Sequence, residues 1–278
     1  MVVKNRKIKF VKLVGAGNDF VLIDNKVCQI TSTDKLKDLA RKMCNRKLGA
    51  GADGLLVRER SRVADLKMRI FNADGSEAQM CGNGARCFAY YFSEVQKTGK
   101  NYLFTLETMA GIVKARVNAD NVRINITQPK DLKLDIPLKV SGRAIKVNFI
   151  NTGVPHTVIF VEALDQIDVF GLGREIRHHR FFAPAGTNVN FVEVVSRDSI
   201  KIRTYERGVE DETLACGTGS VASALVAACN PAIDINKINV HTAGGDVLKV
   251  NFIKNGHQFE DVWLEGKARL VYRGEYYV

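Results

Sequence analysis

The chain has 278 residues, of which 46% are hydrophobic and 26% are charged, and its formal net charge is +11. This composition is typical of a globular protein with an ample core. No apolar run approaches the roughly 20 residues that a membrane span requires, and a strand-like pattern, not the apolar core of a signal peptide, follows the basic N-terminus. We therefore expect a cytoplasmic protein with no membrane partner.

The excess of basic residues could indicate a surface that binds nucleic acid. However, the Lys and Arg residues are scattered over many segments, and the sequence contains no recognition helix and no RNA-binding signature with interleaved aromatic residues. We expect no nucleic-acid partner, and we attribute the charge to a solvated surface that mildly favours an anionic substrate.

The first half of the chain predicts a strand-rich region with two helices. Strands are predicted at residues 8–14, 21–24, 55–58, 66–71, 102–108, 112–117 and 122–126. An amphipathic helix is predicted at residues 33–43, and a second, apolar helix follows Cys81. Between the first two strands, Asn18 and Asp19 are either turn formers or ligand contacts.

The second half has the same character, and segment 128–137, which holds two of the five prolines, is predicted to connect the halves. Strands are predicted at residues 145–151, 189–195, 200–205, 237–241, 246–252, 261–264 and 267–272, and a helix at residues 168–179. His156 follows a proline at the start of a further strand, so its direction is well fixed. A histidine held in this way near a thiol could tune that thiol.

One motif occurs twice. Cys81-Gly-Asn-Gly returns as Cys216-Gly-Thr-Gly, 135 positions later (216 minus 81), and each copy runs into an apolar segment. Residues 68–75 and 201–208 also match, at an offset of 133, which implies a two-residue insertion before the second cysteine.

Two acidic residues extend the repeat, because Glu77 and Glu212 each lie four residues before their cysteine. The chain is therefore predicted to be a duplication. The N-terminal half covers residues 1–130 and is possibly completed by the C-terminal strand, and the C-terminal half covers residues 131–278.

Each copy of the repeated motif reads as a glycine turn that opens a buried helix, with the cysteine just before the helix. A helix N-terminus leaves N–H groups unpaired and carries about half a positive charge, which binds anions and favours a thiolate. Two such sites suggest two matched thiols that face one anionic substrate.

The other four cysteines lie outside the repeated motif, and we interpret them as small buried hydrophobic residues. The chain is too large to need disulfides. No pair has C-x-x-C spacing and no histidine lies near either repeat cysteine in the sequence, so we expect no metal site. The four residues are Cys28, Cys44, Cys87 and Cys229.

From about residue 8 to the C-terminus, the chain resembles the diaminopimelate epimerases, which belong to a superfamily of cofactor-independent amino-acid racemases and epimerases. Several motifs carry the resemblance in order. They are Gly15-Ala-Gly-Asn-Asp-Phe20, Phe71-Asn-Ala-Asp-Gly-Ser-Glu77, Cys81-Gly-Asn-Gly-Ala-Arg-Cys87, Gly153-Val-Pro-His156, Gly186-Thr-Asn-Val-Asn190, Tyr205-Glu-Arg-Gly208 and Ala215-Cys-Gly-Thr-Gly219.

The resemblance implies an α/β (α+β) fold of two pseudo-symmetric domains, each a β-barrel-like sheet around a central helix, with the active site in the cleft between them. It implies epimerisation of LL-diaminopimelate, a small diamino dicarboxylate, to the meso form without a cofactor. It also implies a homodimer with Tyr272 at the interface.

The same resemblance gives roles to individual residues. Cys81 and Cys216 would be a thiol and a thiolate that act as the two general acid/base groups, and His156 and Glu206 would adjust their pKa values. Arg207 is suited to a bidentate grip on the far carboxylate. The implied substrate-binding residues are Asn18, Asn72, Gly82, Asn83, Asn188, Glu206, Arg207, Gly217 and Thr218.

Two departures concern the substrate. Some family members carry amide side chains where this chain has Gly54 and Val154. A racemase of another polar amino acid, independent of pyridoxal phosphate, is therefore an alternative. A thiol redox protein that uses Cys81 and Cys216 is a more distant one.

Overall fold

The computed structural model describes residues 7–97, 101–230 and 235–278, and the chain forms two compact units. The first unit comprises Met1–Ile124 and Gly266–Val278, and the second comprises Asn125–Glu265. The chain thus leaves the first unit, builds the second and returns to the first. Residues 1–6, which contributed to the expectation of no signal peptide, lie outside the described residues.

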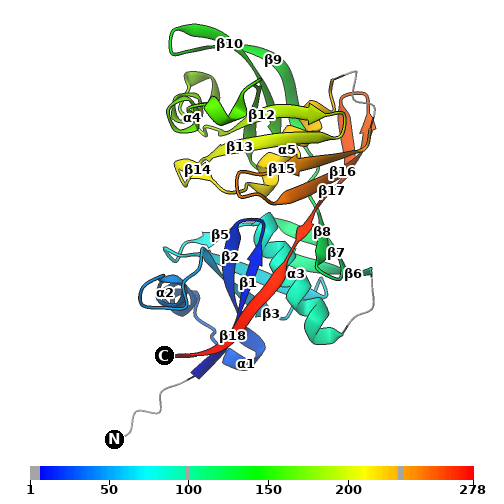
Figure 1. The fold of residues 1–278 in the computed structure, drawn as a ribbon. Coiled ribbons are helices and arrows are strands. Elements are labelled where there is room, and N and C mark those ends of the chain that lie inside the picture. The colour runs from blue at the N-terminus through cyan, green and yellow to red at the C-terminus, as the bar shows by residue number, and fades with distance from the viewer. Residues whose placement is uncertain (1–6, 98–100, 231–234) are drawn as a thin grey trace, which may run out of the picture. The chain divides into compact units, whose positions relative to one another are not determined.

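The first unit contains strands and three helices among its described residues (Figure 1). Its elements are β1 (Lys7–Gly15), β2 (Asn18–Asp24), α1 (Asn25–Cys28), α2 (Thr33–Cys44), β3 (Gly54–Glu59), β4 (Leu66–Asn72), β5 (Glu77–Ala78), α3 (Gly82–Gln96), β6 (Tyr102–Thr108), β7 (Gly111–Asn118), β8 (Asn121–Asn125) and β18 (Arg269–Tyr277).

The second unit is built in the same way. Its elements are β9 (Lys130–Val140), β10 (Arg143–Asn151), β11 (Pro155–Phe160), a 3₁₀ turn (Leu164–Gln166), α4 (Val169–Arg177), a second 3₁₀ turn (Arg180–Phe182), β12 (Asn188–Ser196), β13 (Ser199–Glu206), β14 (Asp211–Thr213), α5 (Gly217–Ala227), β15 (Lys237–His241), β16 (Val247–Asn255) and β17 (Gln258–Lys267). The strands and helices predicted from the sequence are therefore present, with boundaries that differ by a few residues.

The pairing of strands is the same in both units. In the first, β1–β2 is antiparallel, β2–β3 parallel and β3–β4 antiparallel, and β4 pairs with β5 (antiparallel) and β6 (parallel). In the second, β10–β11, β11–β12, β12–β13, β13–β14 and β13–β15 follow the same sequence of orientations. Antiparallel strands β7 and β8, and β16 and β17, complete the series. The two units are thus topological duplicates.

The first unit takes its last strand from the C-terminal end of the chain. β9 follows β8 in the chain but pairs with β10 of the second unit, whereas β18 follows β17 but pairs with β1 of the first unit. Figure 1 shows both pairs side by side. Because the first unit is built from both ends of the chain, the two units cannot be separated by one cut.

The register corrects the predicted alignment of the repeat. Phe71 lies opposite Glu77 in the first unit, and Tyr205 lies opposite Glu212 in the second. Equivalent residues before this hairpin are therefore 134 apart (205 minus 71), and those after it are 135 apart (212 minus 77). The insertion is one residue in the hairpin loop, and the predicted two-residue insertion was wrong.

The segment predicted to connect the halves was also misread. Segment 128–137 is largely β9, which pairs with β10 along most of its length. The strand continues into Leu138 and Val140, which are buried in the core of the second unit. Proline at position 137 is compatible with a strand that has one side of its backbone unpaired.

A helix lies against the strands in each unit. α3 contacts β1, β2, β4, β7 and β18, and α5 contacts β10, β11, β12, β13, β15 and β16. α5 is apolar and buried along nearly its whole length, as expected for a helix covered on all sides. Among the described residues, β18 does not pair with β8 in the first unit and β9 does not pair with β17 in the second, so the strands of neither unit close into a barrel. The expected mixed α/β fold is confirmed.

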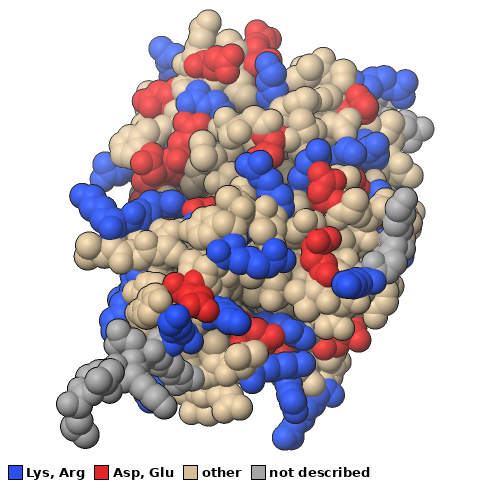
Figure 2. All heavy atoms as spheres, turned by 60° about the horizontal axis from the view of Figure 1, so that its bottom comes forward, with Lys and Arg blue, Asp and Glu red and all other residues tan. Residues whose placement is uncertain are grey.

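No helix among the described residues is long and apolar enough to cross a membrane. On the face shown in Figure 2, Lys and Arg side chains are spread out, with Asp and Glu side chains among them.

Candidate active site

Cys216 caps the N-terminus of α5. Its backbone is extended, and its Sγ accepts a hydrogen bond from the N–H of Gly219 at 3.3 Å. The thiol thus takes the place that a serine or aspartate oxygen usually occupies at a helix N-cap. The N–H groups of Gly217 and Thr218 belong to the first turn, which has no intrahelical partners for them.

The thiol of Cys216 lies beside a carboxyl group. Glu206 hydrogen-bonds to it and also accepts a hydrogen bond from Thr213 Oγ1 at 2.6 Å. Burial raises the pKa of Cys216 well above its ordinary value, and the negative charge of Glu206 raises it further. Burial also raises the pKa of Glu206, although the hydrogen bonds from Thr213 and Cys216 act in the opposite direction. The shift at Cys216 favours a protonated thiol.

His156 is completely buried at the start of β11. Its Nδ1 lies 3.1 Å from Nδ2 of Asn190. That Asn190 nitrogen also lies 3.0 Å from the carbonyl oxygen of Thr157, which can only accept, so it must be the amide N–H₂. Nδ1 of His156 is therefore an acceptor, and the neutral ring carries its proton on Nε2, which has no hydrogen-bond partner in the described part of the chain. Burial, and then the positive charge of Arg207, lowers the pKa of His156 to about 3.

Asn188 and Arg207 are tied together in the same unit. The backbone N–H of Arg207 donates to Asn188 Oδ1 at 2.9 Å, and Asn188 Nδ2 donates to the carbonyl of Pro155 at 3.0 Å. Nη1 of Arg207 donates to the carbonyl of Ala185 at 3.0 Å. Since His156 lies opposite Asn188 on adjacent parallel strands, all three candidate residues belong to one end of β11–β13.

Cys81 occupies the equivalent position in the first unit. It is the N-cap of α3, and its Sγ accepts from the N–H of Gly84 at 3.4 Å. Gly82 and Asn83 begin the helix, as Gly217 and Thr218 do in α5. The helix start predicted after each repeated cysteine is thus confirmed in both units.

Asn18 joins the group around α3. Its Oδ1 accepts from Asn83 Nδ2 at 2.6 Å, and its own Nδ2 donates to Asp53 at 2.9 Å. Asn72 is exposed at the end of β4, where its Nδ2 donates to Ser76 Oγ at 2.9 Å. By the strand register Asn72 is the counterpart of Glu206, since each directly follows the residue opposite the repeated glutamate.

The duplicated scaffold carries different chemistry in its two copies. The register that equates Phe71 with Tyr205 also equates Phe20 with His156 and Leu56 with Asn190. His156 and Asn190 thus have apolar counterparts in the first unit. The two thiols share a helix cap but differ in their surroundings.

The glycine three residues after each cysteine reflects this difference. A Cβ built at Gly84 would lie 3.2 Å from the ends of two flexible side chains, Ile70 and Leu56. One built at Gly219 would clash with Oδ1 of Asn190 and lie 3.2 Å from the sulfur of Cys216. In the second unit the glycine therefore leaves room for the residue that orients His156.

In each unit, the glutamate of the repeat pairs with an arginine on the preceding strand. Arg69 forms two hydrogen bonds to Glu77, at 2.7 and 2.8 Å, and Arg203 forms two to Glu212, at 2.8 and 2.7 Å. These bidentate pairs stabilise the hairpin before each cysteine. Glu77 and Glu212 are thus structural members of the repeat.

Position 54 has no room for a side chain. A Cβ at Gly54 would lie 2.9 Å from the carbonyl oxygen of Phe71, so an amide there requires a shift of β4. In the second unit its counterpart is Asn188. The amide of Asn188 thus has no equivalent in the first unit.

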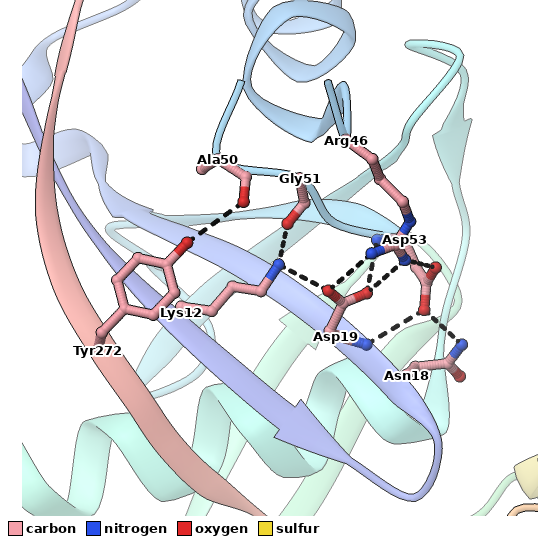
Figure 3. Close-up of polar contacts among 8 residues, drawn as sticks. All are labelled: Lys12, Asn18, Asp19, Arg46, Ala50, Gly51, Asp53 and Tyr272. Atoms are coloured by element: carbon pink, nitrogen blue, oxygen red, sulfur yellow. Dashed lines mark hydrogen bonds and ion pairs between the residues drawn. The ribbon is translucent and has the colours of Figure 1, made fainter. Parts of the chain in front are cut away.

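A network of charged side chains lies beside Asn18 (Figure 3). Arg46 pairs with Asp19 and Asp53, at 2.8 and 2.7 Å, and Lys12 pairs with Asp19 at 2.6 Å. Burial alone would raise the pKa of Asp19, but hydrogen bonds from Arg46 and Lys12 outweigh it and lower the pKa to about 2.

The loop that carries Asp53 has further contacts in the network. Lys12 donates to the carbonyl of Gly51, and the hydroxyl of Tyr272 donates to the carbonyl of Ala50 at 3.2 Å. Strands β1 and β18 thus both hold this loop.

The remaining cysteines behave largely as predicted. Cys28, Cys44 and Cys87 are buried, as predicted. Cys229 is only partly buried, so the prediction that it is a buried residue was wrong. In the described part of the chain, no group of three His, Cys, Asp or Glu residues is arranged to hold a metal ion.

The chain matches the family model described as diaminopimelate epimerase at residues 10–131 and 148–271. It is 43% identical over 276 residues to a diaminopimelate epimerase of Aquifex aeolicus, covering 96% of this chain and 97% of that protein. It is 42% identical over 264 residues to one of Chlorobaculum tepidum, covering 94% and 98%. The chain belongs to the diaminopimelate epimerase family.

Solved structures agree on the fold of this family member. A phenazine biosynthesis protein of the PhzF family from Bacillus anthracis has a TM-score of 0.73 at 17% identity, covering 98% of this chain and 100% of that one. A hydroxyproline epimerase from Agrobacterium vitis, with bound trans-4-hydroxy-L-proline, has a TM-score of 0.70 at 16% identity, covering 100% and 94%. At these identities the likeness concerns the two-domain fold alone.

Sequence reasoning missed several residues that orient the candidate groups of this epimerase. Asn190 lies two residues after Asn188 on one strand, so both point to the same face, and that spacing could have identified it. Thr213 and Asp53 gave no comparable signal, because their partners come from elements that are distant in sequence.

The burial of His156 predicts a stability effect at mildly acidic pH. Its folded pKa of about 3 lies below the unfolded value of 6.5, so the unfolded chain binds the extra proton and stability is lost as the pH falls below 6.5. Between pH 7 and pH 5 this residue should account for a loss of about 2 kcal/mol. Urea unfolding should show that His156→Gln loses about that much less than wild type over this interval.

His257→Gln is the control, because it removes a histidine that is exposed and not buried. The stability of this variant should change with pH as that of wild type does. A His156→Gln protein with an unchanged pH dependence would contradict a neutral, buried His156.

Proposed function

We propose that this isomerase interconverts LL- and meso-diaminopimelate with two cysteines, Cys81 and Cys216, as the acid/base pair. The observation that carries the proposal is that each cysteine caps a helix at the same point of a duplicated fold. Family membership supplies the substrate. We further propose that the enzyme works in the cytoplasm and without a cofactor.

The reaction inverts one Cα. In this proposal a thiolate removes the proton from one face of that carbon, and the other thiol delivers a proton to the opposite face. Each catalytic cycle therefore exchanges the protonation states of the two cysteines, and the roles reverse with the direction of the reaction. General acid/base groups of this kind contribute about 10²–10⁴ in rate.

The helix starts would stabilise the charge that develops as the proton leaves. Negative charge moves from Cα into the α-carboxylate, and first-turn N–H groups are fixed donors for such an anion. The four proposed donors are Gly82, Asn83, Gly217 and Thr218. Because these groups are preorganised, they need no reorientation during the reaction.

The surroundings of Cys216 favour the thiol form before substrate binds, as its raised pKa indicates. Glu206 and His156 are proposed to set this balance, the first as a neighbouring carboxyl and the second as a neutral donor through Nε2. Asn18, Asn72, Asn188 and Arg207 are proposed to hold the amino and carboxylate groups of the substrate.

We also propose that the active enzyme is a homodimer with Tyr272 at the interface. Tyr272 lies on β18, an edge strand of the first unit, and is 41% exposed. Edge strands present unpaired backbone groups that favour pairing with another chain.

Replacing either cysteine should nearly abolish epimerisation. Cys81→Ala and Cys216→Ala should each lower kcat by at least about a hundredfold, the lower bound for loss of a general acid/base, and both should fold, as judged by thermal unfolding. Cys229→Ala is the matched control, since this partly buried cysteine lies outside the repeat. A Cys81→Ala enzyme with more than about a tenth of the wild-type kcat would refute the two-thiol mechanism.

Replacing Arg207 tests the identity of the substrate. If its guanidinium holds the distal carboxylate, Arg207→Lys keeps the charge but loses the fork. The kcat/KM for diaminopimelate should then fall by about 1.5–3 kcal/mol, the value of hydrogen bonds to charged groups.

Lysine lacks the second carboxylate, so it should be a poor substrate whose kcat/KM changes little in this variant. Equal losses on both substrates would favour the alternative of a racemase for another polar amino acid.

A further inference from the structure

Four side chains of the first unit form a continuous chain of hydrogen bonds. Nη2 of Arg86 donates to Asn83 Oδ1 at 2.6 Å, Asn83 Nδ2 donates to Asn18 Oδ1 at 2.6 Å, and Asn18 Nδ2 donates to Asp53 Oδ2 at 2.9 Å. We refer to Arg86, Asn83, Asn18 and Asp53 as the amide relay. It runs from inside α3 to the start of β3.

The direction of the relay is fixed by its two ends. A guanidinium has only donors and a carboxylate has only acceptors. Asn83 must therefore present its oxygen to Arg86 and its nitrogen to Asn18, and Asn18 must do the same toward Asp53. A second contact agrees, because Nδ2 of Asn83 also lies 3.2 Å from the carbonyl oxygen of Ala16, which can only accept.

Both ends of the relay are held firmly. Arg86 is fully buried. Asp53 accepts from Arg46 at 2.7 Å and from the backbone N–H of Asp19 at 3.1 Å, and Arg46 is itself paired with Asp19 (Figure 3). Neither end can reverse its polarity without breaking these contacts, so neither amide can flip.

We propose that Arg86 and Asp53 are positioning residues that fix Asn18 as a hydrogen-bond donor to the substrate. The carbonyl of Asn18 is engaged by Asn83, and one of its two amide hydrogens is engaged by Asp53. The second amide N–H is the donor that Asn18 offers to the substrate. Such a donor binds an oxygen, so this N–H of Asn18 contacts a carboxylate of the substrate.

The proposal rests on the proposed function, in which Asn18 contacts the substrate. It adds the polarity of that contact and the two residues that determine it. The relay also ties Asn83, in the first turn after Cys81, to the β1–β2 turn and to β3. The donor on Asn18 and the helix start at Cys81 are thereby held as one unit.

A double-mutant cycle between positions 18 and 53 tests whether Asp53 acts through Asn18. Asp53→Asn should lower kcat/KM for diaminopimelate by about tenfold, because it replaces the charged acceptor of Asn18 by a neutral amide with a single acceptor oxygen. In the Asn18→Ala background the same change should cost less than about twofold, because its target is gone.

Asp65→Asn is the matched control. Asp65 accepts two hydrogen bonds from Thr105, both at 2.8 Å, in the same unit. This variant can lose stability but should keep kcat/KM, alone and with Asn18→Ala. A tenfold loss from Asp53→Asn that persists in the Asn18→Ala background would overturn the proposal.

An exchange of the two side chains tests the polarity. Asn18→Asp alone brings two carboxylates within hydrogen-bonding distance and should lower the Tm. Adding Asp53→Asn lets the new amide donate to the new carboxylate, so the Tm should recover in part. The kcat/KM should stay at least about tenfold down, because position 18 then offers only acceptors. Recovery of kcat/KM together with the Tm would overturn the assignment of Asn18 as a donor.

The wild-type enzyme separates this proposal from the proposed function. A wild type that does not epimerise diaminopimelate would contradict the function. In that case the coupling between positions 18 and 53 in thermal unfolding would still test the relay, and additive changes in stability would overturn it.

Discussion

The structure depends on one local constraint, a cysteine that serves as the N-cap of a buried helix. A sulfur in this place must accept from the backbone N–H three residues later, and both thiols do so. The glycine that supplies that N–H leaves space beside the sulfur, and the first-turn N–H groups stay available to an anion. Acid/base group and anion site are thus built from one short segment, which explains why the motif can be duplicated as a whole.

Duplication gives the two segments the same surrounding strands. β18 returns from the end of the chain to the sheet of the first unit, so the two units cannot be separated by a single cut. The side chains at equivalent strand positions differ between the two units. Around Cys216 the strands carry Glu206, His156 and Asn190, whereas the first unit has Asn72, Phe20 and Leu56 at the same register positions. A symmetric fold therefore presents two thiols in unlike surroundings, and the first unit contributes the amide relay instead.

Much of this could be predicted from the sequence, because the decisive signals are local. A glycine turn before an apolar run predicts the helix starts, and alternation predicts most strands. The alignment of the repeat failed by one residue because the hairpin loops differ in length, and only the pairing of Phe71 with Glu77 and Tyr205 with Glu212 sets the register. The tautomer of His156 and the direction of the amide relay depend on contacts between distant segments, which no local pattern records.

The most direct test of the central claim is to follow solvent hydrogen at Cα. LL-Diaminopimelate is incubated with the enzyme in D₂O, with no cofactor added, and early product and recovered substrate are compared by NMR and mass spectrometry. Two thiols acting on opposite faces predict meso product with deuterium at the inverted carbon, while the recovered LL substrate is initially almost unlabelled. Product that retains the original hydrogen, or substrate labelled as fast as product, would show that a single base serves both faces and would contradict the account.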